Sequence, residues 1–433
     1  MPNECEFLNF VNERRAVIAI IGLGSTGLPV AQGYVDRGFP VRGIDINTVR
    51  VDELRNGRSY LSYLSDQEIQ TLTEDSFLVG TDFCAVADAD VVIVCVPTPL
   101  GTDGDADLSS VHTAFDAIAP YANRGVLVML QSTVPPGTTD VLAARLAAKS
   151  GLVVGTDLFV AFAPERIDPA NTAGWSVVTT PRVVGGVTPE CTRRASAVVE
   201  ALCAKAVTVS DTRTAEMTKI VENTFRMVNI VLANEISDVC RDLGVSEREI
   251  VEAASTKPFA FLAHRPGPGI GGDCIPVVPA FLLANAGRSG IPMPIIATAH
   301  RQIAQRPHAV VARLTETLAR RGCRIEASKV LVLGVAYKEN VNDTRNAPAL
   351  RIVERLLQLG ATVAYHDPLI PELTVGDHRL ESQACEPSDA ASYDCAVLVT
   401  AHPEMLDRID PTPFPVVLDT RHVLSAGGNV EWL

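Results

Sequence analysis

The sequence predicts an α/β fold in which two doubly wound domains are joined by a central helical domain. Short apolar runs that read as strands alternate with helix-compatible stretches at both ends of the chain. This alternation is typical of parallel sheets covered by helices on both faces. Between these ends the pattern is mainly helical. We therefore expect an extension over residues 1–15 and domains over 16–212, 213–322 and 323–433.

In the N-terminal part the strand-like runs are short and continuously apolar. The first, VIAIIGL, ends in glycine and is followed by a helix-compatible stretch from Thr26 to Arg37. Apolar runs of this length suit strands that are buried on both faces of a parallel sheet. We expect strands at 17–23, 39–46, 90–97, 125–133, 159–167 and 182–186.

The central part begins with one long helical pattern from Arg213 to Leu243, which Gly244 is expected to end. Apolar residues recur along it at three- to five-residue spacing, at Ile220, Phe225, Val228, Leu232 and Ile236. A loop rich in glycine and proline interrupts the helical region at 265–276, before a helix expected at 279–286. The C-terminal part then predicts a helix over 347–360 and strands at 329–337, 361–367, 395–400 and 414–420.

Composition and charge exclude several classes of protein. The formal net charge is −14 and no basic run exists, which excludes a nucleic-acid binder. The longest apolar run, at 91–96, is far shorter than the roughly 20 residues of a membrane helix. The N-terminus does not read as a secretion signal. Ten cysteines without a C-x-x-C pair, and eight histidines without metal spacing, predict a cytoplasmic protein with reduced thiols and no metal.

A glycine pattern indicates a dinucleotide site. Gly22, Gly24 and Gly27 form G-x-G-x-x-G between an expected strand and an expected helix, as in Rossmann-like domains. Asp45 ends the second strand, where an acid binds ribose hydroxyls and repels a 2′-phosphate, so NAD is favoured over NADP. The alternative is a glycine turn in an unrelated α/β protein. Arg50 is either a surface residue or a cover for the adenine.

Cys274 stands out from the other nine cysteines because of its surroundings. It lies in PGPGIGGDCIP, where four glycines and three prolines in eleven residues cost chain entropy unless the backbone must approach another group closely. The helix expected at 279–286 begins shortly after Cys274 in the sequence. A helix N-terminus there favours the thiolate and supplies backbone N–H groups to an oxyanion. Cys274 is therefore expected to be a nucleophile that captures an aldehyde. The alternative is a buried, inert thiol.

With these residues in place, the chain resembles the UDP-glucose/GDP-mannose dehydrogenase family, and within it the branch that oxidises UDP-N-acetylglucosamine or UDP-N-acetylmannosamine. The resemblance covers about residues 16 to 425. It rests on GLGSTGLPVA (22–31), VCVPTP (94–99), QSTVPPGTT (131–139), APERIDPAN (163–171), AEMTKIVENTF (215–225), TKPFAF (256–261), PGPGIGGDCIP (266–276) and GVAYKENVNDTR (334–345).

The resemblance implies oxidation of the sugar C6 hydroxymethyl group to a carboxylate, with two NAD consumed. Cys274 would carry the thiohemiacetal and then the thioester. Lys219 and Asn223, four apart on one helix, would hold the oxygen at C6. Glu165 would position water for thioester hydrolysis as a general base.

The resemblance also implies binding roles. Thr98 and Thr133 would line the nicotinamide or phosphate side, and Arg345 would reach the cofactor. Arg345 and Lys338 could instead form surface ion pairs with Asp343 and Glu339. Positive charge for the diphosphate of the UDP-sugar is expected near the loop that contains Gly271. The residues implied are Arg265, Lys338 and Lys257. A homodimer through the central helical domain is also implied, and surface-polysaccharide or natural-product biosynthesis is the expected context.

One position departs from the family pattern. The family usually has aspartate four residues after the cysteine, where this chain has Val278, and valine cannot orient water. Asp273, just before the cysteine, either compensates in part or places a like charge beside the thiolate. Three readings stay open: the same chemistry on another UDP-sugar such as UDP-glucose or on a nucleotide 5′-alcohol, oxidation altered at Val278, and an inactive homologue that binds UDP-sugar or NAD.

Overall fold

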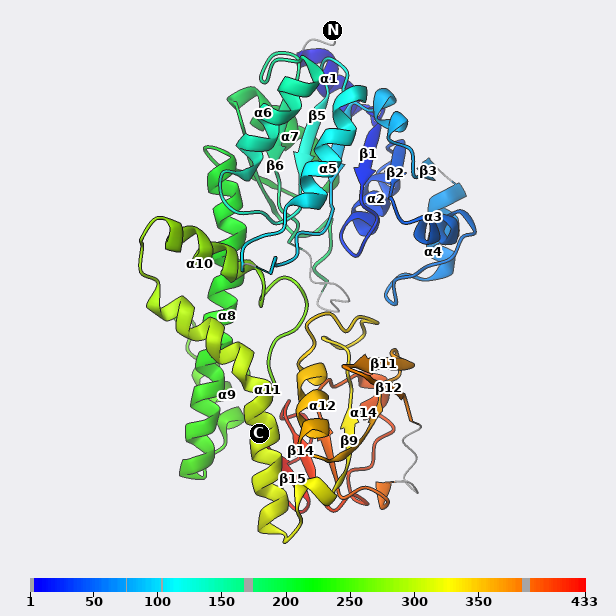
Figure 1. The fold of residues 1–433 in the computed structure, drawn as a ribbon. Coiled ribbons are helices and arrows are strands. Elements are labelled where there is room, and N and C mark those ends of the chain that lie inside the picture. The colour runs from blue at the N-terminus through cyan, green and yellow to red at the C-terminus, as the bar shows by residue number, and fades with distance from the viewer. Residues whose placement is uncertain (1–3, 75, 103, 167–173, 384–389) are drawn as a thin grey trace. The chain divides into compact units, whose positions relative to one another are not determined.

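The computed structural model describes residues 4–74, 76–102, 104–166, 174–383 and 390–433. The chain divides into two compact units (Figure 1). The first consists of Met1–Glu222 with Ala280–Arg288, and the second of Asn223–Pro279 with Ser289–Leu433.

The first unit contains an eight-stranded sheet in the order β3-β2-β1-β4-β5-β6-β7-β8. The central strands β1, β4, β5 and β6 are each four residues long and buried throughout, as their apolar runs predict. The bounds are β1 Ile18–Ile21, β2 Val41–Ile44, β3 Phe77–Gly80, β4 Val91–Val94, β5 Leu127–Leu130, β6 Phe159–Phe162, β7 Arg182–Gly186 and β8 Ala206–Thr208.

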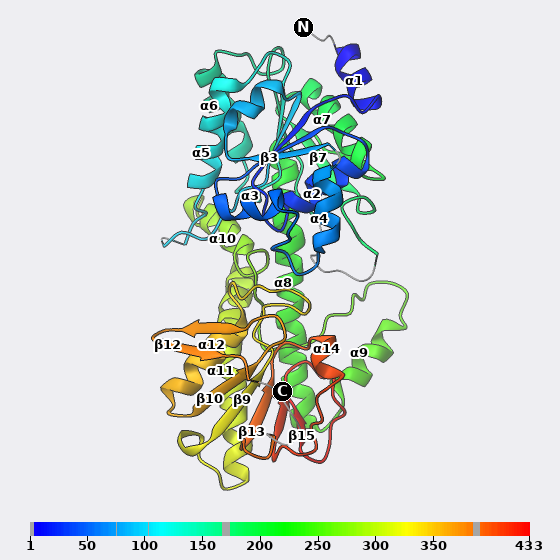
Figure 2. The same cartoon turned by 90° about the vertical axis from the view of Figure 1, so that its right-hand side faces the viewer.

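Helices cover both faces of this sheet (Figure 2). One face packs against α1 (Glu4–Asn12), α2 (Gly27–Asp36) and α7 (Pro189–Leu202), and the other against α5 (Ser109–Ile118) and α6 (Thr138–Ser150). Helices α3 (Thr48–Arg55) and α4 (Asp66–Glu74) lie beside β3. The doubly wound prediction is thus confirmed. The extension over residues 1–15 contains a helix that the sequence did not predict, and its Phe7 and Val11 are buried against α7.

The expectation of a wholly parallel sheet was wrong at one strand pair. Strand β7 runs antiparallel to β6, with Ala161 opposite Gly186 and Phe162 opposite Gly185. A parallel neighbour needs a crossover connection, usually a helix, and the described part of the connection between β6 and β7 contains none. The other strand pairs of this sheet are parallel.

The second unit combines helices with a five-stranded parallel sheet in the order β10-β9-β13-β14-β15. Helix α8 (Thr212–Leu243) matches the predicted long helix, and Gly244 follows it with φ +68°. The hairpin β11–β12 and strand β15 were not predicted. Helix α10 (Val278–Arg288) belongs to the first unit from Ala280 onward. The remaining bounds are α9 Glu247–Ser255, α11 Pro294–Arg320, β9 Lys329–Leu333, α12 Pro348–Gln358, β10 Thr362–His366, β11 Glu372–Val375, β12 His378–Glu381, β13 Cys395–Leu398, α14 Pro403–Leu406, β14 Val417–Asp419 and β15 Val430–Trp432.

Candidate active site

The glycine turn between β1 and α2 leaves no room for side chains at two of its positions. Gly22 has φ +90°, and a Cβ there would lie 2.8 Å from the carbonyl oxygen of Cys95. A Cβ on Gly27 would lie 1.8 Å from the carbonyl oxygen of Gly22. At Gly24, by contrast, no described atom lies within 4 Å of the Cβ position. A backbone with this open face fits a dinucleotide pyrophosphate at the N-terminus of α2.

Asp45 stands at the end of β2 and is almost fully buried. Its Oδ2 accepts the N–H of Leu23 at 2.8 Å, and its Oδ1 accepts the N–H of Asn47 at 2.8 Å. The acid predicted to bind ribose therefore also holds the glycine turn in place. Arg50 lies 3.5 Å from Asp45 Oδ2, with its guanidinium 5.7 Å from the centroid of the Tyr60 ring.

Two tyrosines that sequence reasoning missed also hold this turn. The hydroxyl of Tyr60 donates to the carbonyl oxygen of Leu23, and that of Tyr63 donates to the carbonyl oxygen of Ser25 at 3.0 Å. Burial raises the pKa of Tyr60, so its hydroxyl stays a donor. Both residues lie in the connection between α3 and α4, three apart, a spacing that carries no recognisable signal of this contact.

The two predicted threonines come together at the carboxyl ends of neighbouring strands. Strands β4 and β5 pair in register, and Thr98 and Thr133 follow their ends. The Thr98 hydroxyl donates to the carbonyl oxygen of Thr133 at 2.7 Å. This edge of a doubly wound sheet is where ligands bind.

Glu216, which sequence reasoning also missed, anchors α8 to the loop that starts α6. It is fully buried and accepts hydrogen bonds from Gly137 N at 2.5 Å, Thr139 N at 2.8 Å and Thr139 Oγ1 at 2.6 Å. Burial raises its pKa despite these donors. Since Lys219 follows three residues later on the same helix, this anchor fixes the turn of α8 that contains Lys219.

Glu165 follows the end of β6 and is held on two sides. Its Oε1 accepts its neighbour's backbone N–H, that of Arg166, at 2.7 Å, and its Oε2 pairs with the buried guanidinium of Arg182. The Arg166 guanidinium binds Glu222 on α8 at 2.6 Å. The rest of the APERIDPAN motif, residues 167–171, lies outside the described residues.

Lys219 and Asn223 lie one helical turn apart on α8, as predicted. Within the described part of the chain, the Lys219 ammonium has no hydrogen-bond or ion-pair partner. The Asn223 side chain donates to the carbonyl oxygen of Cys274 at 3.3 Å. Asn223 is therefore bound directly to the loop that contains the predicted nucleophile.

The loop around Cys274 is fixed on several sides, while the cysteine itself is exposed. Gly267 N donates to Asn234 Oδ1 at 2.9 Å, and Gly272 N donates to the carbonyl oxygen of Arg345 at 2.8 Å. A Cβ on Gly271 would lie 2.6 Å from the Cβ of Tyr337. The close approach that the glycines of this loop predicted is therefore, at Gly271, an approach to the side chain of Tyr337.

The described contacts of the Asp273 carboxylate are with residues other than Cys274. It pairs with Arg345, and its Oδ1 accepts Asn346 Nδ2 at 3.3 Å. Arg345 also binds Asp343 at 2.6 Å, so the alternative of an ion pair there is confirmed. Val278, the first residue of α10, is buried at 3% exposure. The described contacts therefore give no support to Asp273 as a substitute for the missing acid.

The residues predicted to meet the UDP-sugar are mostly exposed. Lys257 lies 4.9 Å from the centroid of the Phe259 ring, and Arg265 lies 3.8 Å from Glu252. Lys338 follows β9 in the loop that also contains Tyr337. Sequence reasoning missed Arg421, whose Nη1 would lie 3.3 Å from a Cβ on Gly267. Burial lowers its pKa, and its place directly after the strand expected at 414–420 is the signal that could have found it.

In the sheet of the second unit, as in that of the first, an acidic residue follows the strand that comes second in the sequence. Asp367 follows β10, and its Oδ2 accepts Val335 N at 2.7 Å and Ala336 N at 3.0 Å in the turn after β9. Its Oδ1 accepts the N–H groups of Leu369 and Ile370, at 2.9 and 3.2 Å. His402 Nε2 lies 3.2 Å from Oδ2.

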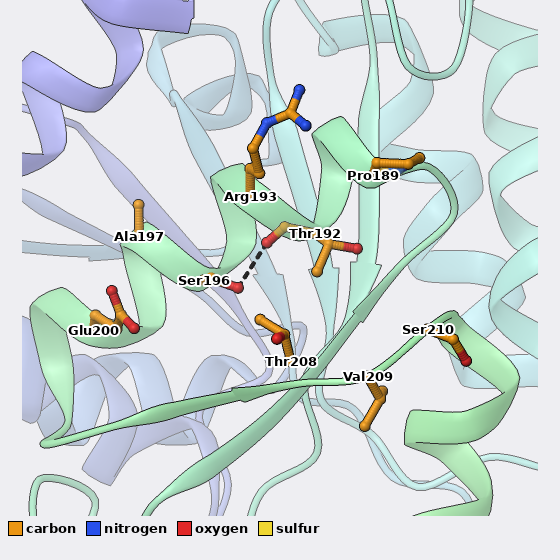
Figure 3. Close-up of a pocket in the computed structure, with 9 residues that line it drawn as sticks. All are labelled: Pro189, Thr192, Arg193, Ser196, Ala197, Glu200, Thr208, Val209 and Ser210. Atoms are coloured by element: carbon orange, nitrogen blue, oxygen red, sulfur yellow. Dashed lines mark hydrogen bonds between the residues drawn. The ribbon is translucent and has the colours of Figure 1, made fainter.

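Two surface grooves lie apart from the predicted residues. One, of about 480 Å³, is formed by α7 and β8, where the Ser196 hydroxyl donates to the carbonyl oxygen of Thr192 at 2.7 Å (Figure 3). The other, of about 530 Å³, lies between Pro136 and the first turns of α8. Neither is lined by a predicted site residue. No helix among the described residues is long and apolar enough to cross a membrane.

Comparison with known proteins gives consistent matches along the chain. Three models of the UDP-glucose/GDP-mannose dehydrogenase family match: the NAD binding domain at residues 16–203, the central domain at 213–303 and the UDP binding domain at 331–426. A UDP-N-acetyl-D-mannosamine dehydrogenase of Pyrococcus horikoshii is 35% identical over 392 residues, covering 89% of this chain and 90% of the relative. An NDP-N-acetyl-D-galactosaminuronic acid dehydrogenase of Ralstonia solanacearum is 35% identical over 421 residues, covering 94% and 96%.

Solved structures agree with these matches. A UDP-D-ManNAc dehydrogenase from Pyrococcus horikoshii superimposes with a TM-score of 0.86 at 30% identity, covering 96% of this chain and 98% of the other. A UDP-glucose dehydrogenase from Pyrobaculum islandicum gives 0.84 at 27% identity, covering 94% of each. The chain therefore belongs to the UDP-glucose/GDP-mannose dehydrogenase family, and it is an NAD-dependent oxidoreductase that acts on the CH–OH group of a UDP-sugar.

Proposed function

We propose that this chain oxidises the C6 hydroxymethyl group of a UDP-N-acetylhexosamine to a carboxylate. The observation that carries the proposal is the exposed Cys274 on a loop whose backbone is held by Asn223, Asn234 and Arg345. A nucleophile must be accessible while its loop is fixed. The names of relatives that act on N-acetylated sugars support the substrate class.

In the proposed reaction, bound NAD supplies the hydride acceptor for both oxidations. The Cys274 thiolate adds to the C6 aldehyde, which forms the S–C bond of a thiohemiacetal, and oxidation of this adduct leaves a thioester. Lys219 and Asn223 bind the oxygen at C6 and offset its negative charge. Glu165 accepts a proton from the attacking water, the C–S bond breaks, and the thiolate and carboxylate are released.

The binding roles follow the same proposal. Gly22, Gly24, Gly27, Asp45 and Arg50 hold the adenosine and pyrophosphate half of NAD. Thr98 and Thr133 line its nicotinamide or phosphate side. A cofactor role for Arg345 stays a prediction from the family resemblance, since its guanidinium is bound to Asp343 and Asp273. The UDP-sugar is bound by the loop at Gly271 and by the basic residues Lys257, Arg265 and Lys338, since a diphosphate needs local positive charge on an acidic protein.

The test follows NADH at 340 nm with UDP-N-acetylmannosamine, UDP-N-acetylglucosamine and UDP-glucose. Two NADH per sugar and an acidic product are expected with an N-acetylated sugar. Cys274→Ser is expected to abolish turnover to the acid. Full turnover by that variant would overturn the mechanism, and ligand binding without turnover of any sugar would favour an inactive homologue.

A second outcome is favoured by the buried Val278 in the place of the family's aspartate. Its aliphatic side chain cannot orient water, so oxidation that stops at the aldehyde, with one NADH per sugar, is the alternative product pattern. Val278→Asp is expected to raise the rate of thioester hydrolysis. An unchanged rate and pH profile would show that the position is unimportant in this chain.

The central helices support a homodimer as part of the proposal. Six apolar side chains of α8 are between 41% and 68% exposed, and their three- to seven-residue spacing places them on one face: Val221, Phe225, Leu232, Ile236, Val239 and Leu243. An exposed apolar stripe of this kind suits burial against a second copy. Light scattering should give twice the chain mass, and Leu232→Glu should give the monomer.

A further inference from the structure

Arg182 is a fully buried arginine whose charge none of the predicted roles explains. It is the first residue of β7 and is only 1% exposed. Its Nη2 binds Glu165 Oε2. Its Nε and Nη1 have no hydrogen-bond partner among the described residues. Since a buried cation is costly without a counter-charge, Glu165 is the residue that makes this burial tolerable.

The antiparallel pairing of β7 brings the two residues together. Ala161 pairs with Gly186 and Phe162 with Gly185. Continued beyond the end of β6, this register places residue 165 opposite residue 182. A parallel neighbour would have placed the start of β7 at the other end of the sheet. The strand that departs from the predicted topology therefore delivers a cation to the residue proposed as general base.

The other ionisable groups around Glu165 do not replace this cation. Burial raises the pKa of Tyr34 on α2 and of Cys95 after β4, so both stay neutral. The Arg166 guanidinium is directed to Glu222 at 2.6 Å and to the carbonyl oxygen of Pro181 at 2.8 Å. Arg182 is thus the cation that binds the Glu165 carboxylate among the contacts described.

We infer that Arg182 is a positioning residue that keeps the Glu165 carboxylate aimed in one direction. The inference rests on the proposed role of Glu165 as the base for thioester hydrolysis. Arg182 binds one oxygen of this carboxylate, and the Arg166 N–H fixes the other. Arg182 therefore acts through Glu165, on hydrolysis rather than on substrate binding.

The test compares Arg182→Met, Arg182→Lys and, as a matched control, Arg194→Met. Arg194 is also buried in the first unit, where it binds Glu190 at 2.9 Å and stacks on Phe159. With Arg182→Met, hydrolysis of the thioester should slow, while the steps before it should not. Turnover at neutral pH should fall at least roughly tenfold, KM for UDP-N-acetylmannosamine should change little, and acylated Cys274 should accumulate in intact-mass spectra.

Arg182→Lys keeps the charge and should restore most of the turnover. Arg194→Met should lower thermal stability without accumulation of acylated Cys274. Wild-type turnover by Arg182→Met, without acylated Cys274, would overturn the inference. If Arg182→Met does not fold, Arg182→Lys decides, because accumulation of acylated Cys274 in a variant that keeps the cation would overturn it.

Glu165→Gln separates the two proposals. If this variant hydrolyses the thioester as fast as wild type, the assignment of the base fails, and the inference fails with it. If it accumulates acylated Cys274 while Arg182→Met does not, the base assignment stands and the inference alone fails. Arg182→Met should add little to the loss in the Glu165→Gln background, since both act at one step.

Discussion

The buried carboxylate of Glu216 is expected to stabilise the first unit by tying α8 to the start of α6. Glu216→Ala leaves three donors without an acceptor, from Gly137 and Thr139. Each unsatisfied buried donor costs about 1–3 kcal/mol, and such losses are not additive. We expect a loss of about 3–5 kcal/mol of unfolding free energy. Glu216→Gln keeps an acceptor for Thr139 but turns an amide toward the Gly137 N–H, so about 1–3 kcal/mol is expected.

The pH dependence gives a sharper test. Burial raises the pKa of Glu216, so the folded chain binds this proton more tightly than the unfolded chain. This tighter proton binding stabilises the folded chain fully below the pKa of glutamate in the unfolded chain, about 4.3. The stabilisation is lost as the pH rises through the higher pKa of Glu216 in the folded chain. The stability gap between wild type and Glu216→Gln should therefore be largest at low pH and narrow as pH rises.

Urea unfolding at several pH values, with hydrogen exchange of residues 137–150, measures both effects. Exposed Glu200 on α7 supplies the control, because Glu200→Gln should change stability by less than about 0.5 kcal/mol. Equal urea midpoints for wild type and Glu216→Ala, or a gap that widens with pH, would refute the reasoning.

Three further outcomes are expected. Asp45→Ala should raise KM for NAD and speed hydrogen exchange at residues 22–28, because the N–H of Leu23 loses its acceptor; unchanged values would contradict the assigned role. Gly271→Ala should lower stability by about 1–3 kcal/mol in thermal unfolding, because its Cβ meets that of Tyr337, whereas Gly287→Ala, with no described atom within 4 Å, should not. Although burial opposes it, the hydrogen bond with His402 lowers the pKa of Asp367, so acidification below about pH 4 should cost wild type stability that Asp367→Asn does not lose.

Local patterns were sufficient to predict much of this architecture. Apolar runs located the buried strands, because burial on both faces imposes a continuous apolar run on the sequence. The three- to five-residue spacing from Ile220 to Ile236 located α8, although Phe225, Leu232 and Ile236 are exposed on this helix. Glycine turns were equally readable, since Gly22 and Gly27 have no room for a Cβ. The order and direction of β7 were not, because they depend on pairing between distant segments rather than on composition.

The candidate site divides along the same line. Gly22, Lys219 and Cys274 lie in motifs that are contiguous in sequence, so the sequence and the family resemblance could single them out, and their roles stay predictions. Residues that act on these through long-range contacts were missed, because an arginine at the start of a strand or a glutamate on a helix reads as an ordinary surface charge. Arg182, Glu216, Tyr60, Tyr63 and Arg421 belong to this group.

Asp45 after β2 and Asp367 after β10 stand at equivalent places in the two sheets, but their carboxylates accept different numbers of hydrogen bonds. Asp367 receives four backbone N–H groups and His402, which exhausts the roughly four lone pairs of a carboxylate, whereas Asp45 receives two backbone N–H groups and Arg50 at 3.5 Å and retains capacity for a further donor. We therefore expect the dinucleotide to bind beside Asp45 rather than beside Asp367. In the proposed four-electron oxidation, spent coenzyme must leave and a fresh molecule enter midway. Covalent attachment to Cys274 as the thiohemiacetal would then keep the aldehyde intermediate bound while the coenzyme is exchanged.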